Sequence, residues 1–379
     1  MAGALARESA TLPVTMNTVL EKWTETLMAP GMFGLDRTNL DFTKPDSWGK
    51  NKFNNTFPVA LLCYFDEKDL LPSQVELTVD AGGKPRVSNR AVPVREALGI
   101  APGRAAFYFE QVYEPFKKFV DGQVNSSDVV VARRIDGAHV RPLEIKLVVV
   151  PDSTTRGQDR AEQSCEIVAR PLMIENIALN LCVSFAGSRP RLLDILNRHL
   201  KQPNKWHWDQ PSEMRRRFPE VLSAFEAVLA DDPGRQQPMV LQPIWRTQGQ
   251  TARLDDECFD IFIWTDYAFT QMIVDSAHHA HAKTISRPQR SLIWIIRMLW
   301  DFATTGRVDA RGTTHNISLQ GQTDKAGSFA GTTTRNYLSS RVREHPRLGP
   351  ESIPEIVLGN GLEFLAPERR FDAAIYFGS

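Results

Sequence analysis

Two runs rich in β-branched residues, 128–134 and 139–150, are separated by the short sequence Ile-Asp-Gly-Ala at residues 135–138. An Asp-Gly pair between such runs is the strongest short-range signal for a β-hairpin. The second run is mostly apolar, so any fold of this chain has to bury it. The sequence therefore predicts two adjacent antiparallel strands in a core near the middle of the chain.

Two charged residues interrupt the apolar part of the second strand. Glu144 and Lys146 alternate there with Leu143, Ile145 and Leu147. Because residues i and i+2 of a strand point to the same face, the carboxylate and the ammonium are expected to project together. An unpaired charge in a buried strand is costly. Glu144 and Lys146 are therefore expected either to pair with each other or to serve a function.

A third charged residue belongs to the same pattern. Asp128 lies sixteen residues before Glu144, at the start of the partner strand. Two carboxylates and a lysine that meet at a sheet edge are suited to metal-assisted hydrolysis of a phosphodiester. Carboxylate oxygens are ligands that Mg²⁺ accepts, and a bound metal stabilises charge on the phosphate and acidifies water. The sequence thus indicates a metal-dependent nuclease.

The register of the hairpin tests this hypothesis. A regular two-residue turn at Asp136-Gly137 would pair Asp128 with Ile145 and point it to the wrong face. A three-residue loop or one bulge would place Asp128 opposite Glu144 or Lys146 instead. The chemistry therefore predicts an irregularity in this hairpin.

Two alternatives remain open at this stage. Glu144 and Lys146 can form a structural salt bridge on a half-exposed strand. A second set with the same order of residues, Asp46 followed by Asp66 and Lys68, also occurs in the chain. Asp66 and Lys68 of that second set follow the apolar run 57–65, which we expect to be a buried strand, and have the appearance of a solvated strand end.

Composition excludes several classes of protein. The chain has 379 residues, enough for one large α/β body or two subdomains. It carries 45 basic and 45 acidic residues, so any polyanion must bind a local basic patch. The four cysteines are scattered, which argues against a structural zinc site or a disulfide scaffold. No signal peptide or membrane span is apparent, which predicts a soluble, cytoplasmic protein.

The rest of the pattern predicts an α/β fold: a mixed β-sheet core flanked by helices, with a largely helical C-terminal half. A third strand is expected at 165–171 and a helix at 172–185. The other expected helices are 14–28, 189–200, 211–230 and 286–303, the other strands are 238–245, 259–264 and 371–377, and a long loop is expected at 306–340. We divide the chain into an N-terminal region (1–100), a catalytic core (101–200) and a C-terminal region for DNA recognition and dimerisation (201–379).

The motifs of this core resemble those of a known family. Asp128, the sequence LEIKL at 143–147, VPDSTT at 150–155 and SCEIVARP at 164–171 resemble type II restriction endonucleases of the HindVP/HgiDI family, in the PD-(D/E)xK superfamily. Ser127 stands where that motif has proline. The resemblance implies a restriction-endonuclease-like fold and Mg²⁺-dependent cleavage of both strands of a palindrome, GRCGYC for that family. It implies that Asp128, Glu144 and the main-chain carbonyl of Ile145 are metal ligands and that Lys146 is the catalytic lysine.

Other residues are weaker candidates. Glu110 or Glu114 can supply an extra metal ligand, although a solvated helix face with Lys117 and Lys118 explains them equally, and Glu166 can face the cleft or form an ion pair. Hydroxyl and basic side chains that can contact DNA directly follow the catalytic strand. Others lie in a basic segment, residues 283–347, which contains eleven Lys and Arg residues and four Asp and Glu residues. These candidate DNA contacts are Ser153, Thr154, Thr155, Arg156, Lys325 and Arg335.

The sequence thus predicts a site-specific DNA endonuclease of a restriction-modification system. Cleavage of both strands of a palindrome favours a homodimer on double-stranded DNA. A methyltransferase of matching specificity is the expected functional partner. The rivals are a repair or structure-specific nuclease with the same catalytic residues, and a DNA-binding protein in which those residues are structural.

Overall fold

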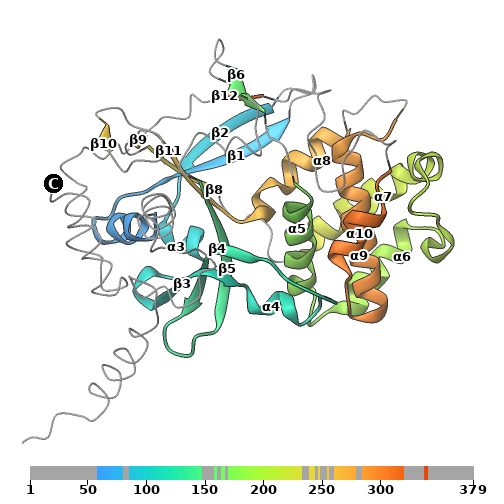
Figure 1. The fold of residues 1–379 in the computed structure, drawn as a ribbon, viewed down its shortest axis with the longest axis horizontal. Helices are drawn as coiled ribbons and strands as arrows, with labels where there is room; N and C mark the ends of the chain where they lie inside the picture. Colours follow the sequence, from blue (N-terminus) through green and yellow to red (C-terminus); the bar gives the residue numbers. More distant parts are fainter. Residues whose placement is uncertain are drawn as a thin grey trace, which may run out of the picture.

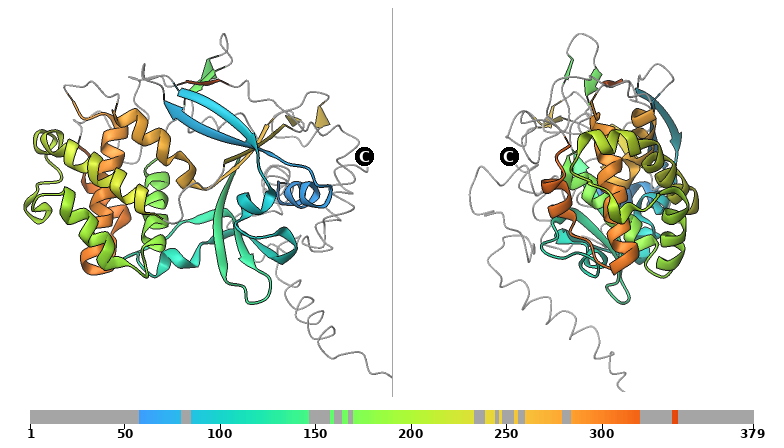
Figure 2. Two further views of the ribbon diagram at one scale, coloured as in Figure 1. Left: turned by 180° about the vertical axis from the view of Figure 1, so that it is seen from behind. Right: turned by 90° about the vertical axis from the view of Figure 1, so that its right-hand side faces the viewer.

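The computed structural model describes residues 58–79, 85–146, 158–159, 164–166, 170–232, 239–243, 246–247, 254–255, 260–278, 284–319 and 337–339. Helices α5 to α10 gather at one end of the molecule, and the strands of a large sheet lie at the other (Figure 1). The view from behind in Figure 2 shows the same division, with α5 among the helices nearest to strands β4 and β5. The predicted helix at 14–28 and the predicted strand at 371–377 lie outside the described residues.

One seven-stranded sheet forms the centre of the fold, with the order β2-β1-β8-β11-β5-β4-β3. Every pairing described within it is antiparallel, so the prediction of a mixed sheet is wrong. Short connections join β1 to β2 and β4 to β5, and such connections allow only antiparallel neighbours. The strands are β1 (Ser73–Val79), β2 (Pro85–Ala91), β3 (Ala105–Val112), β4 (Ser126–Arg133), β5 (His139–Lys146), β8 (Met239–Pro243) and β11 (Asp260–Trp264).

The helices predicted at 172–185, 189–200, 211–230 and 286–303 are present to within two residues at each end, and the described C-terminal half is rich in helix. Helices with one antiparallel sheet are consistent with the predicted α/β class. The sheet nevertheless takes strands from residues 73–91, 105–146 and 239–264, that is, from each of the three regions we had separated. The helices are α3 (Val94–Leu98), α4 (Glu114–Lys117), α5 (Pro171–Ser184), α6 (Arg189–His199), α7 (Pro211–Asp231), α8 (Thr270–His278), α9 (Arg287–Thr305) and α10 (Ala310–Asn316).

The first apolar run is a helix and not the strand we predicted. Residues 58–67 are helical, and all side chains from Val59 to Phe65 are buried. A short run that is apolar on every side fits a buried strand and a fully buried helix equally well, because neither shows a polar face. Tertiary packing decides the matter here in favour of the helix.

The two faces of the sheet pack against different cores. Leu143 and Ile145 of β5 join Val129, Ile263 and the helical residues 58–65 in one core cluster. The alternating positions of β5 and β11 point to the other face, where Trp264 belongs to the core that α5 and α9 build. Glu144 therefore lies on the helical side of the sheet.

The side chain of Arg141 connects β5 to α3. Arg141 donates to the carbonyls of Glu96 (2.5 Å) and Ala97 (2.7 Å) at the end of α3. That helix ends at Gly99, which has a left-handed φ of 75°. Burial lowers the pKa of Arg141 to about 10, so this side chain stays charged at neutral pH.

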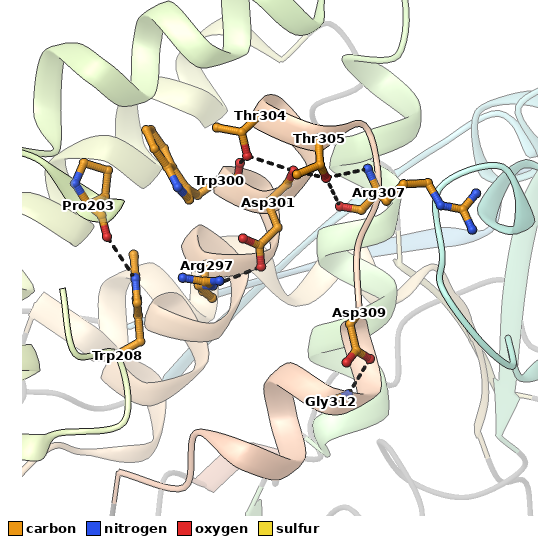
Figure 3. Close-up of polar contacts among 10 residues, drawn as sticks. All are labelled: Pro203, Trp208, Arg297, Trp300, Asp301, Thr304, Thr305, Arg307, Asp309 and Gly312. Atoms are coloured by element: carbon orange, nitrogen blue, oxygen red, sulfur yellow. Dashed lines mark hydrogen bonds and ion pairs between the residues drawn. The ribbon is translucent and has the colours of Figure 1, made fainter. Parts of the chain in front are cut away.

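The predicted loop at 306–340 contains a helix. Thr304 and Thr305 return hydrogen bonds to main-chain carbonyls of α9, and the chain then leaves the helix at Gly306, φ 81° (Figure 3). Asp309 begins α10, because its Oδ1 accepts from the N–H of Gly312 at 2.8 Å. We missed this short helix because its Gly, Thr and Asn content is typical of loops, whereas the cap stabilises its first turn.

We predict that Asp309→Ala lowers the free energy of unfolding by about 1 kcal/mol, the usual cost of removing an N-cap. Asp309→Asn should stay near the wild type, because an asparagine oxygen also caps a helix. Urea denaturation of the two variants measures the difference. Equal losses in both variants would contradict a capping role.

The helical end of the molecule docks onto the connection between β3 and β4. Arg307 points away from α9 (Figure 3) and donates to Asp121 Oδ1 at 2.7 Å and to the carbonyl of Val120 at 3.0 Å. Val120 and Val308 form a parallel bridge beside this contact. Since β4 begins a few residues later, this contact helps to fix the position of Asp128.

Two small sheets complete the described strands. One has the order β12-β7-β6, from Tyr337–Ser339, Ser164–Glu166 and Gln158–Asp159, and the other pairs β9 (Arg246–Thr247) with β10 (Leu254–Asp255). The predicted third strand is therefore β7, and Glu166 lies on it, outside the large sheet. Among the described helices, none has the length and hydropathy that crossing a bilayer requires.

Candidate active site

The β4–β5 hairpin contains the predicted irregularity. Val131 pairs with Arg141, but Ala132 pairs with His139, so the register shifts between these two steps. Below the shift, Val129 pairs with Leu143. One step further along, the same register sets Asp128 opposite Glu144, where the Cβ atoms of an antiparallel pair are about 4.5–5.5 Å apart. With this bulge, extending the described register by one step puts the two predicted carboxylates at facing positions.

Asp128 also makes a structural contact. The described ladder between β4 and β5 ends at Val129 and Leu143, and beyond it Asp128 Oδ2 accepts from the main-chain N–H of Ile145 at 2.8 Å. This hydrogen bond provides the main-chain N–H of buried Ile145 with an acceptor at the point where the two strands stop pairing. Asp128 therefore stabilises the hairpin at the position where we expect it to act.

Glu110 is the next carboxylate across the sheet. Phe109 pairs with Val129 and Gln111 pairs with Ser127, so Glu110 occupies the position between these pairs, beside Asp128. Its φ of 50° is left-handed, which breaks the regular alternation of β3 at this residue. Glu114, in contrast, begins α4 at the surface and pairs with Lys117 at 2.6 Å, the solvated arrangement that we gave as its alternative.

A cavity adjoins Glu144 on the helical side of the sheet. It lies between the start of β4, the end of β5, the end of β11 and the first turns of α5. We did not predict the residues that α5 and β11 contribute to this lining. The lining residues are Ser126, Ser127, Pro142, Leu143, Glu144, Arg170, Leu172, Met173, Asn176, Asn180, Trp264 and Asp266.

Several predicted residues cannot be placed. The backbone of Lys146 pairs with Phe262 in the sheet, but the side chain of Lys146 lies outside the described part of the structure. The candidate DNA contacts Ser153, Thr154, Thr155, Arg156, Lys325 and Arg335 also lie outside it.

Three arginines in the described part of the basic segment make contacts within the fold. Arg290 is 2% exposed and donates to a main-chain carbonyl at 3.1 Å. Arg297 pairs with Asp301, and Arg307 pairs with Asp121. These three arginines have partners within the protein, whereas Arg311 of the same segment is exposed.

The rival set of catalytic residues receives little support. Asp66 and Lys68 lie at the exposed end of the first helix, where Lys68 covers the ring of Tyr64, and Asp46 lies outside the described residues. On α8, the imidazole of His278, a residue type that often binds metals, pairs with the carboxylate of Glu226 at 2.7 Å. Within the described parts of the chain, no three His, Cys, Asp or Glu side chains gather as a metal-ligand group.

Comparison with known proteins identifies the family. A model of the HindVP restriction endonuclease family matches residues 48–379. The chain belongs to this family. The type II restriction enzyme HgiDI of Herpetosiphon aurantiacus is 34% identical over 353 residues, 93% of this chain and 96% of that protein. The probable type II restriction enzyme HindVP of Haemophilus influenzae is 31% identical over 353 residues, 92% of this chain and 94% of that protein.

No solved structure matches this HindVP-family chain. The predicted family is confirmed, and with it the prediction of a restriction endonuclease. Membership covers all three regions of the chain that we had separated, so it supports the sheet and the helices as parts of one enzyme.

Proposed function

We propose that this chain is a type II restriction endonuclease that hydrolyses both strands of a short palindromic DNA site at Asp128, Glu144 and Lys146. The observation that carries the proposal is the bulge between Val131 and Ala132. The register below this bulge, extended by one step beyond the described pairs, puts Asp128 opposite Glu144. A regular hairpin would not do so. A structural salt bridge between Glu144 and Lys146 would not require this register.

The donor groups suit Mg²⁺. Asp128 and Glu144 offer hard carboxylate oxygens from neighbouring strands, and the carbonyl of Ile145 lies between Glu144 and Lys146 on the chain. Mg²⁺ in enzymes is usually bound through one or two carboxylates and keeps several waters, so a pair of acids is sufficient. Glu110 is an additional candidate ligand from β3.

Each residue has a distinct task in the proposed PD-(D/E)xK mechanism. Mg²⁺, when bound, supplies charge stabilisation at the phosphate and acidifies a water molecule. Asp128 and Glu144 would hold and orient the Mg²⁺ ion. Lys146, two positions beyond Glu144 on β5, offsets the negative charge of the phosphate and positions the attacking water or accepts its proton.

The partners follow from this chemistry and from the family. We infer that the substrate is double-stranded DNA with the site GRCGYC, cut by a two-fold homodimer in the cytoplasm. A host that carries this enzyme needs a methyltransferase of the same specificity to protect its own DNA. Residues 320–347 and 153–156 are the proposed sources of DNA contacts.

Digestion of plasmid DNA tests the proposed function. We expect discrete fragments that map to GRCGYC, formed with Mg²⁺ and abolished by EDTA. A smear of products would favour a repair or structure-specific nuclease. Binding without any cleavage, at several Mg²⁺ and Mn²⁺ concentrations, would favour a DNA-binding protein and contradict the proposal.

A further inference from the structure

The turn between β4 and β5 carries an apolar side chain that the fold does not bury. Ile135 is 93% exposed, the highest value among the exposed large hydrophobic side chains of the described residues. Tyr108, 41% exposed, lies beside the same turn, where its hydroxyl is 3.5 Å from the position that a Cβ atom would take on Gly137. The turn lies away from helices α6 to α9 (Figure 1). Two exposed apolar side chains therefore gather at one turn.

Polar contacts hold this turn in one conformation. The carboxylate of Asp136 accepts from the Arg133 guanidinium at 2.6 and 3.1 Å and from the main-chain N–H of Ala138 at 3.1 Å. The main-chain N–H of Gly137, a residue with a left-handed φ of 67°, donates to the carbonyl of Arg133 at 2.8 Å. Ile135 is therefore presented at a fixed place, and a partner that binds it has little disorder of the turn to overcome.

The charges around Ile135 indicate what kind of partner fits it, since a single exposed apolar side chain alone does not. Arg104, Arg133 and Arg134 are exposed, and the main-chain N–H of Arg134 donates to the carbonyl of Arg104 at 2.9 Å. The turn and the adjoining strand ends contain one acid, Asp136, which pairs with Arg133 at 2.6 Å. The turn is thus locally basic in a chain without net charge, which favours an anionic partner.

DNA fits these features better than a second copy of the chain does. A stable protein interface buries about 800 Å² on each partner and has a core depleted of charge. Ile135 and Tyr108, in contrast, stand among three arginines. Proteins that bind DNA grooves insert single apolar side chains at base steps, and their arginines enter the groove or contact phosphates. An isoleucine on a rigid basic turn has the chemistry of such a contact.

The turn belongs to the hairpin that carries the candidate cleavage site. Ile135 follows Asp128 by seven residues. A strand rises about 3.3 Å per residue, so the two positions are about 20–23 Å apart along the hairpin. The duplex rises about 3.4 Å per base pair, so this distance equals about six to seven base pairs. A contact at that distance from a phosphate within GRCGYC lies in the DNA that flanks the site.

We propose that the β4–β5 turn binds a groove of the DNA that flanks the cleavage site, with Ile135 in the groove and Arg104 at an adjoining phosphate. The duplex then runs along the hairpin from Asp128 and Glu144 to the turn. This groove contact rests on the proposed function, because it assumes that cleavage takes place at those two carboxylates. It adds affinity from outside the recognised sequence.

Binding to duplexes of two lengths, measured without divalent metal, tests the groove contact. Both contain GRCGYC, but one extends about ten base pairs beyond it on each side and the other about two, so only the first reaches the turn. The wild type should bind the longer duplex more tightly. Ile135→Ser should bind the longer duplex about 10-fold more weakly than the wild type, the fold-change that corresponds to burial of one apolar side chain. The two proteins should bind the shorter duplex equally.

Leu71→Ser is the matched control for Ile135→Ser. Leu71 is also an exposed aliphatic side chain, at 46%, but it precedes β1 and lies outside the hairpin. This variant should bind both duplexes like the wild type. The Tm of Ile135→Ser should equal or exceed that of the wild type, because a side chain that is 93% exposed contributes little packing. An unchanged Tm excludes misfolding as the cause of weaker binding.

The salt dependence of binding tests the charged part of the groove contact. Arg104→Gln should reduce the slope of log K against log salt for the longer duplex by about 1, the change expected when one phosphate contact is lost. Arg198→Gln removes an exposed arginine that pairs with Asp194 on α6, far from the turn in Figure 1. Its slope should remain that of the wild type. Equal changes in both variants would contradict a contact at Arg104.

The outcomes separate the groove contact from the proposed function. If the wild type binds both duplexes equally, or Ile135→Ser binds the longer one as tightly as the wild type, the groove contact is overturned and the proposed function stands. If Ile135→Ser dissociates an oligomer in sedimentation velocity and loses affinity equally for both duplexes, the turn joins two copies and the groove contact is overturned. Glu144→Gln should bind the longer duplex tightly and not cleave it. Wild-type cleavage by Glu144→Gln would contradict the proposed function alone.

Discussion

Replacing Glu144 or Lys146 by alanine is expected to lower the rate of DNA cleavage by about 100- to 1,000-fold or more, the cost of removing one group that stabilises transition-state charge. Sequence-specific binding should remain nearly unchanged. Affinity for DNA comes from contacts spread along the duplex, whereas these two side chains act at the scissile phosphate. Single-turnover cleavage, together with binding measured without divalent metal, separates the two effects.

Glu96→Ala is a suitable control for that experiment. Glu96 is an exposed carboxylate that pairs with Arg90 at 3.5 Å, on α3 and away from the cavity. It should cleave at the rate of the wild type. Near-normal cleavage by Glu144→Ala or by Lys146→Ala would move the active site elsewhere, and Asp46, Asp66 and Lys68 would be the next residues to replace.

Two substitutions at Asp128 are expected to separate its structural role from its catalytic one. Asp128→Ala removes the acceptor of the Ile145 N–H, and a buried donor without a partner costs about 1–3 kcal/mol of stability. Asp128→Asn retains an oxygen in the same place, so its stability should stay close to that of the wild type. Both variants should lose cleavage, because neither offers a carboxylate to a metal.

Urea denaturation and single-turnover cleavage of the same two proteins provide the measurements. Wild-type cleavage by Asp128→Asn would show that Asp128 serves only the hairpin. Glu110, which lies beside Asp128 on β3, would then be the first carboxylate to test.

The hairpin illustrates how far a local pattern leads. The alternation in β5 indicated which of its residues are buried, and the chemistry required an irregular connection to β4. The structure contains that irregularity between Val131 and Ala132. The exact position of the shift was not predictable, because several bulges satisfy the same turn sequence and differ only in packing against α3 and the neighbouring strands.

The errors have a common origin in tertiary context. The apolar run 57–65 was expected to be a strand and is helical from residue 58, since a segment that is buried on all sides carries no periodic signal. The sheet was expected to be mixed and is antiparallel throughout its described pairings. Strands β8 and β11 come from the C-terminal half of the chain, extend the sheet, and also pair antiparallel with their neighbours. Local sequence contains no information about such long-range pairing.

The sequence by itself therefore determined the family, a fold of helices and strands, the four longest of the described helices and the candidate pair of carboxylates with the neighbouring lysine. These depend on residue type, spacing and alternation, which are local properties. Only the tertiary structure decided that β11 and α5 close a cavity over Glu144 and bring Asp266, Asn176 and Trp264 to it. Those residues lie far apart on the chain, and they meet because burying the apolar faces of the sheet and of α5 together excludes water from both.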